Sequence, residues 1–184
     1  MQKRKTKMAL KTMITLSLFV AISIVCGKFL AIPVGEILRF SFENLPIIMA
    51  GMLFGPVGGV VVGVMADLIG CVLKGYTIVP LVTVGAGVVG LVSGLTWKPI
   101  QKTKIPYVFR IILTVFVSHF WGSVIVKTFG LADFYSLEYN MSVEILMLWR
   151  FLNYVIVGGV EGVLLFFLMK NKMITSQFHR GDNA

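Results

Sequence analysis

The sequence predicts an all-α membrane protein, a compact bundle of six transmembrane helices in which helices 2 and 3 are short and both termini are cytoplasmic. The first observation is composition: 57% of the 184 residues are hydrophobic and 14% are charged, which is too apolar for a soluble domain. The second is length, which accommodates about six spans of ~20 residues with short loops. The third is charge placement, because basic residues gather at both ends and in one loop. We therefore expect a single transmembrane domain over residues 1–184.

The spans follow from apolar runs and their breaks. The first runs from about residue 8 to 32, after a basic tail at residues 1–7, and a loop at 33–43 follows it. The long run at 45–73 is interrupted by Gly55-Pro56, which predicts two short helices instead of one. The remaining spans are expected at about 78–95, 108–129 and 145–169.

Parity supports the count of six. The tail at 170–184 carries Lys170, Lys172 and Arg180, so it should be cytoplasmic like the basic N-terminus. Two cytoplasmic ends require an even number of crossings, and only the break at Gly55-Pro56 makes the number even. The loop at 97–107 is also basic, as this topology requires of a cytoplasmic loop.

The segment Leu38–Gly70 carries the strongest functional signal. Gly59, Gly63 and Asp67 recur every four residues, so they share one helical face on which a second helix can approach closely. An ionisable group at membrane depth is costly and faces a partner, a cavity or a ligand. Asp67 is thus either a ligand-binding acid, a loop cap, or half of an ion pair with a nearby lysine or arginine.

Other polar residues map near the outer ends of the predicted helices. His119, Ser123 and Lys127 form a stripe at four-residue spacing, and the last span carries Arg150, Tyr154 and other polar residues on roughly one face. The charged residues expected at an outward-facing pocket are Arg39, Asp67, Lys74, Lys127 and Arg150. Cations outnumber acids in this set, which favours a mostly anionic ligand with one donor edge.

Several function classes are disfavoured. Cys26 and Cys71 lie singly in apolar runs, so neither a metal site nor a disulfide framework is expected. The eight acids are spread out and no Walker motif exists, because Tyr76 stands where its lysine would be, so we expect neither an enzyme nor a cofactor. The net charge of +9 reflects membrane orientation, and no nucleic acid partner is expected.

The first span has a face of small residues. Ser17 and Ala21 are four apart, a spacing that suits close helix packing. The partner is either another helix of this chain or a separate membrane subunit.

The stretch LRFSFENLPIIMAGMLFGPVGG, followed by ADLIG, resembles the substrate-binding S components of energy-coupling factor (ECF) vitamin transporters, most closely the folate-specific branch. The matching features are Arg39, Leu45-Pro46, Phe54-Gly55-Pro56 and Asp67-Leu68, and Arg150 resembles a late arginine of the last helix. Ser17 and Ala21 stand where the family usually has two alanines, and the serine is a departure.

The resemblance implies a subunit of the cell membrane that captures a vitamin from outside and has no ATPase of its own. Its partners would be a transmembrane coupling subunit and two ATP-binding subunits. Ser17 and Ala21 would dock the coupling subunit. In a folate complex Asp67 would meet the pterin, and Arg39 and Arg150 the benzoyl-glutamate. The substrate-binding set it implies is Arg39, Phe42, Asp67, Lys74, His119, Lys127, Arg150 and Tyr154.

Two alternatives remain open on the sequence. One is an S component for another anionic vitamin or precursor, since related vitamins share the scaffold. The other is a structural membrane subunit without transport function, whose small-residue faces would serve assembly alone.

Overall fold

The computed structural model describes residues 2–34, 38–132 and 142–171, and the side chains of 10–33, 40–132 and 142–171. Among these residues, five helices are long and apolar enough to cross a membrane, so the chain is a multi-pass membrane protein. The elements are α1 (Gln2–Ile24), the π-helix η1 (Val25–Phe29), β1 (Ile32–Val34), β2 (Leu38–Phe40), α2 (Asn44–Lys74), α3 (Pro80–Gln101), α4 (Tyr107–Ser118), the π-helix η2 (His119–Val126) continued by helical residues 127–132, and α6 (Val143–Lys170).

The break predicted at Gly55-Pro56 is confirmed. Gly55 has φ +81° and ψ −177°, a conformation that a side chain would strain, and Pro56 cannot donate to the preceding turn. A Cβ on Gly51 or on Gly59 would lie 2.6 or 2.3 Å from the same Gly90 carbonyl oxygen. The two positions are therefore within about 5 Å of each other, whereas eight residues of straight helix would separate them by about 12 Å. The chain turns back at Gly55, and both halves of α2 pack on α3.

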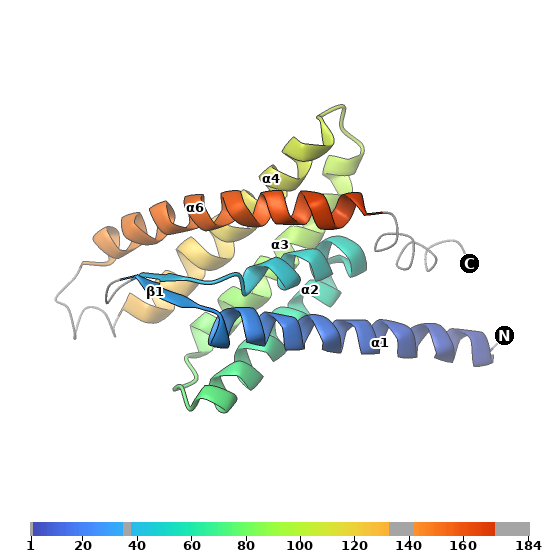
Figure 1. Cartoon of the computed structure of the whole chain (residues 1–184), viewed down its shortest axis with the longest axis horizontal. Coiled ribbons are helices and arrows are strands. Elements are labelled where there is room, and N and C mark those ends of the chain that lie inside the picture. The colour runs from blue at the N-terminus through green and yellow to red at the C-terminus, as the bar shows by residue number, and fades with distance from the viewer. Residues whose placement is uncertain (1, 35–37, 133–141, 172–184) are drawn as a thin grey trace.

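The bundle has two distinct ends (Figure 1). The start of α1, the end of α6 and the α3–α4 connection lie at one end, which we call the termini end. The break in α2 faces the same end, because Lys98 Nζ is 4.0 Å from the position of a Cβ on Gly55. The β1–β2 hairpin, the turn between α2 and α3, and the start of α6 lie at the opposite end, which we call the hairpin end.

The packing of α2 on α3 depends on the glycine face found in the sequence. A Cβ on Gly63 would lie 2.3 Å from the Ala86 carbonyl oxygen, and one on Gly90 would lie 2.2 Å from the backbone of Gly59. The two backbones are in direct contact along this face, as small residues permit. This contact fixes the height and rotation of Asp67, which continues the same face.

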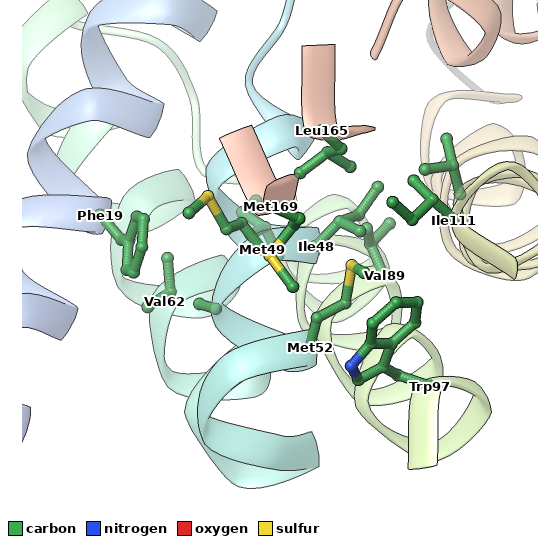
Figure 2. Packing of buried hydrophobic residues seen from close by; sticks show 13 residues of the cluster. Phe19, Ile48, Met49, Met52, Val62, Val89, Trp97, Ile111, Leu165 and Met169 are labelled. Carbon is green, nitrogen blue, oxygen red and sulfur yellow. The ribbon is translucent and has the colours of Figure 1, made fainter. Parts of the chain in front are cut away.

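A hydrophobic core joins all the long helices (Figure 2). Phe19 of α1 lies against the second half of α2, where Val62 is fully buried. The first half of α2 is the centre of the core, with Ile48 flanked by side chains from α3, α4 and α6. Burial of this short helix on every side explains why its sequence is apolar all round.

Some details of the fold differ from the sequence prediction. The segment 33–43, expected as a loop, contains an antiparallel hairpin in which Pro33 pairs with Arg39, so the protein is not purely α-helical. Strands of three residues are too short for a period-two pattern to stand out. The helix α1 already begins at Gln2, and α3 extends to Gln101, beyond the expected end at 95. The outer loop predicted at 131–144 lies largely outside the described residues.

Candidate functional site

Two polar clusters are buried at the hairpin end. The first, the Asp67 cluster, consists of Lys28 from η1, Asp67 and Cys71 from α2, and Thr83 from α3. The second, the Lys127 cluster, joins the start of α2 to η2 and the helical turn after it. Its members are Glu43, Asn44, His119, Ser123 and Lys127.

The Asp67 carboxylate is satisfied on both oxygens. Thr83 Oγ1 donates to Oδ2 at 2.7 Å, and Lys28 Nζ lies 3.4 Å from Oδ1. Asp67 is only 7% exposed and the Lys28 side chain 11%, so the pair is shielded from solvent and membrane. The interpretation of Asp67 as half of an ion pair with a lysine is therefore confirmed, and Lys28 is a residue that the sequence analysis missed.

Lys127 is held by acceptors from the start of α2. Its Nζ donates to Glu43 Oε1 at 2.7 Å and to Asn44 Oδ1 at 3.4 Å. Lys127 is 2% exposed, and a buried ammonium needs such partners because its desolvation is costly. The amide of Asn44 donates in turn to Ser123 Oγ at 3.3 Å. The polar stripe of the fifth predicted span thus faces α2, not lipid.

A histidine–glutamate pair extends the Lys127 cluster toward the bundle centre. His119 Nε2 lies 2.5 Å from Glu161 Oε2, and its Nδ1 lies 3.5 Å from Asn44 Nδ2. His119 and Glu161 are 1% and 0% exposed. The ring of Tyr154 stacks on His119 with centroids 4.9 Å apart, and Arg150 donates to the Tyr154 hydroxyl at 3.5 Å.

Two groups near this pair have unused hydrogen-bonding capacity. Among the described residues, Glu161 Oε1 and Arg150 Nε are buried without a hydrogen-bond partner. Leaving such groups buried is costly. Both lie on α6, one on each side of Tyr154 in the sequence.

A small cavity lies between members of the two clusters. Its lining includes Lys28 and Asp67 from the first cluster, Glu43 from the second, and the neighbouring Ser23 and Ala86. Its volume of about 10 Å³ accommodates roughly one water molecule. A drug-sized ligand needs several hundred Å³. Binding one here therefore requires side chains or whole elements to move.

The structure brings together part of the residue set expected from sequence. Asp67 lines the cavity together with Glu43, the partner of Lys127. His119 connects the Lys127 cluster to Tyr154 and Arg150 of α6. Phe42 is half-buried just before α2. Arg39 lies on β2, a strand that packs on α6, and its side chain is outside the described set.

Lys74 lies apart from both clusters. Its side chain is exposed, and its Nζ sits 4.3 Å from the ring centroid of Phe29. The geometry therefore gives it no contact with Asp67. The physical reason is displacement along the helix axis. Seven residues bring Lys74 roughly back to the face of Asp67 but about two turns further on, past the end of the bundle core.

The sequence predicted more cations than acids at the pocket. Among the described side chains, the acids there are Glu43, Asp67 and Glu161 and the cations are Lys28, Lys127 and Arg150, while the side chain of Arg39 lies outside the described residues. Lys28 was missed because it stands alone at the end of an apolar span. Glu43 was placed at the end of the loop at 33–43, so its contact with a buried lysine was not anticipated. No described group of three or more His, Cys, Asp and Glu side chains is arranged to hold a metal.

The family follows from comparison with known proteins. A family model described as the ECF transporter, substrate-specific component, matches residues 11–173. The chain belongs to this family. The resemblance drawn from the sequence is therefore confirmed at the level of the family, which is a class of transport component. No curated protein matches the chain by sequence.

Solved structures of the family share the fold. A crystal structure of FolT bound with folic acid matches with a TM-score of 0.66 at 22% identity, covering 85% of this chain and 91% of that one. The S component of a bacterial ECF transporter matches with a TM-score of 0.61 at 22% identity, over 90% and 98% of the two chains. The S component for biotin from an ECF-type ABC transporter gives 0.58 at 18% identity, over 86% and 92%.

Proposed function

We propose that this chain is the S component that captures a folate on the outer side of the membrane and delivers it through a coupling subunit driven by two ATP-binding subunits. The observation that carries the proposal is the pair of buried polar clusters around one cavity at the hairpin end, within a member of the substrate-specific component family. A bundle that served assembly alone would have no use for four buried or half-buried charged residues at one end, which are Lys28, Glu43, Asp67 and Lys127.

The proposal includes a topology of six crossings with both termini cytoplasmic. The two halves of α2 count as separate crossings because the chain reverses at Gly55. The termini end carries Lys98, Lys102 and Lys104 in exposed positions, and Lys170 at the end of α6. This excess of lysine marks the cytoplasmic side. The hairpin end, with its two clusters, then faces outward, where a vitamin would arrive.

Folate fits a site that holds both acids and cations. Its pterin offers amide and amine donors at one end, and its glutamate offers two carboxylates at the other. Asp67 supplies the acceptor for the pterin, and Lys127, Arg150 and Arg39 supply cations for the benzoyl-glutamate. The shared fold with FolT bound with folic acid supports this choice of ligand.

The main alternative is another vitamin with both a donor edge and a carboxylate. The fold is equally that of an S component for biotin, whose ureido ring donates and accepts and whose tail ends in one carboxylate. Biotin has one anionic group, whereas the described site holds Lys127 and Arg150 on separate helices. Two cations on separate helices favour folate, which carries two carboxylates, over biotin, which carries one.

Docking of the coupling subunit is proposed for the outer face of α1. Ser17 and Ala21 are both exposed, so they do not serve packing within the bundle. They lie in an apolar row with Met13, which is 65% exposed. Small side chains in such a row allow a partner helix to approach closely.

The first experiment is to identify the bound molecule. Detergent-extracted protein expressed in cells is denatured, and the released small molecule is identified by mass spectrometry. Calorimetry then measures the affinity of the protein for folic acid, for a pterin without the glutamate, and for biotin. If the purified protein releases biotin and binds it in calorimetry, but neither releases nor binds a folate, the ligand is biotin and the folate assignment is wrong.

The second experiment tests the two ends of the site. Asp67→Asn keeps an acceptor but loses the charge, so it should weaken the binding of folic acid and of the pterin alike, by about ten- to a hundred-fold. Arg150→Ala should weaken folic acid far more than the pterin. If each of the two variants weakens the binding of folic acid and of the pterin by the same factor, the assignment of the pterin to Asp67 and of the glutamate to Arg150 is wrong.

A further inference from the structure

Two ion pairs of opposite polarity flank the cavity. In one, the segment 25–43 contributes the cation Lys28 and the bundle contributes the acid Asp67. In the other, the same segment contributes the acid Glu43 and the bundle contributes the cation Lys127. The cavity is lined by Lys28, Glu43 and Asp67 together, so both pairs belong to one site.

Glycines make room for both side chains of the segment. A Cβ on Gly70 would lie 2.8 Å from Lys28 Cε, so the lysine stem lies directly on the backbone of α2. A Cβ on Gly27 would lie 2.6 Å from Glu43 Cβ and 2.7 Å from Glu43 Oε2. Lys28 and Glu43 thus occupy defined positions between elements and are not loosely placed surface charges.

The chemistry of these two groups matches that of the proposed ligand. Lys28 presents N–H donors to Asp67, as the donor edge of a pterin would. Glu43 presents a carboxylate to Lys127, as a glutamate tail would. We propose that Lys28 and Glu43 are internal competitors, which hold the two binding charges of the bundle when no ligand is bound and are displaced by it.

This inference rests on the proposed function and adds a rule for substrate selection. A ligand that displaces both side chains must satisfy both Asp67 and Lys127, because a buried charge left without a partner costs more than the pair gained. The site therefore selects molecules that carry a donor edge and a carboxylate on one framework. A fragment with only one of these displaces only the matching side chain and binds weakly.

The two competitors differ in strength. The Lys28–Asp67 contact is long at 3.4 Å, whereas Lys127–Glu43 is short at 2.7 Å and is supported by Asn44. Hydrogen bonds weaken with length. Glu43 is therefore the stronger competitor, and its removal should have the larger effect.

The test is calorimetry with three probes on the full chain in detergent: folic acid, a pterin without the glutamate, and p-aminobenzoyl-glutamate. Lys28→Met keeps the stem and removes the charge, so it should strengthen pterin binding by about ten-fold and leave p-aminobenzoyl-glutamate unchanged. Glu43→Gln should strengthen p-aminobenzoyl-glutamate by at least that factor and leave the pterin unchanged. Lys28→Arg, with a planar fork that suits a carboxylate better, should weaken the pterin.

The controls are Lys102→Met, which removes an exposed lysine at the termini end, and Glu144→Gln, which removes an exposed acid outside the cavity lining. Neither should change any of the three affinities. Gel filtration establishes that each variant is folded and monodisperse. If Lys28→Met or Glu43→Gln weakens its matching fragment or leaves it unchanged while the wild type binds folic acid, the competitor role is overturned and the folate proposal stands. If the wild type binds none of the probes, the folate proposal fails and this inference fails with it.

Discussion

The contact of α2 with α3 gives the sharpest prediction about stability. Gly63 packs so that an added Cβ would lie 2.3 Å from the Ala86 carbonyl oxygen, 2.7 Å from its carbon and 3.1 Å from the Gly87 nitrogen. All three are backbone atoms, so no side chain can rotate away and the two helices must separate. We expect Gly63→Ala to cost about 3 kcal/mol of unfolding free energy, the upper end of what overpacking usually costs.

The separation of α2 from α3 should also disturb the contacts of Asp67 at the candidate site. Asp67 is one helical turn beyond Gly63, and its 2.7 Å hydrogen bond to Thr83 crosses the same contact. Pushing the helices apart lengthens this bond, so Gly63→Ala should also weaken pterin binding. For a chain of this size, 3 kcal/mol corresponds to a melting temperature about 6–12 °C lower, which is measurable by thermal unfolding in detergent.

A matched control is available in α6. A Cβ on Gly159 would meet no atom within 4 Å, and its helical conformation is ordinary. Gly159→Ala should therefore be neutral, or should stabilise the helix by up to about 1 kcal/mol through better helix propensity. Equal melting temperatures for Gly63→Ala and Gly159→Ala would refute the reasoning, because the two positions differ only in the space around the added methyl.

Three further predictions concern topology, docking and the loop at the termini end. In a variant without Cys26 and Cys71, a cysteine at Tyr76 should be labelled from outside intact cells by an impermeant reagent and one at Lys102 should not; labelling at Lys102 would contradict six crossings. Ala21→Trp places a large side chain on the exposed face of α1, so it should retain vitamin binding and abolish uptake with the coupling subunits; native uptake would discard this docking face. Arg110 donates to the carbonyl oxygens of Gln101, Thr103 and Ile105. Arg110→Met should therefore destabilise the α3–α4 loop by about 1.5–3 kcal/mol, which would be seen as faster proteolysis in the loop. An unchanged cleavage rate would show that these hydrogen bonds do not stabilise the loop.

Much of the architecture could be read from the sequence because membrane burial imposes simple patterns. Apolar runs of sufficient length must form helices in lipid, since every backbone group has to be hydrogen-bonded within the segment. The reversal at Gly55-Pro56 was visible because a proline after a glycine cannot continue a regular helix. The face of Gly59, Gly63 and Asp67 was visible because helical periodicity alone places these residues together.

The sequence was less informative where local patterns are short or absent. The hairpin pairs three residues with three, and the π-helical segments η1 and η2 have no recognised signature in side-chain periodicity. The π-helical segments belong to the site, since η1 carries Lys28 and η2 carries His119 and Ser123. These segments and the hairpin were found only in the three-dimensional structure.

The sequence by itself determined that this protein is a membrane bundle of the substrate-specific component family and that Asp67, His119, Lys127 and Arg150 are unusual at their depth. Only the tertiary structure decided which charges meet. Lys28 and Asp67 are 39 residues apart, and Lys127 and Glu43 are 84 apart. No periodicity relates such positions, because the pairing of charges depends on how helices pack, whereas a charged residue within an apolar run is visible in the sequence alone.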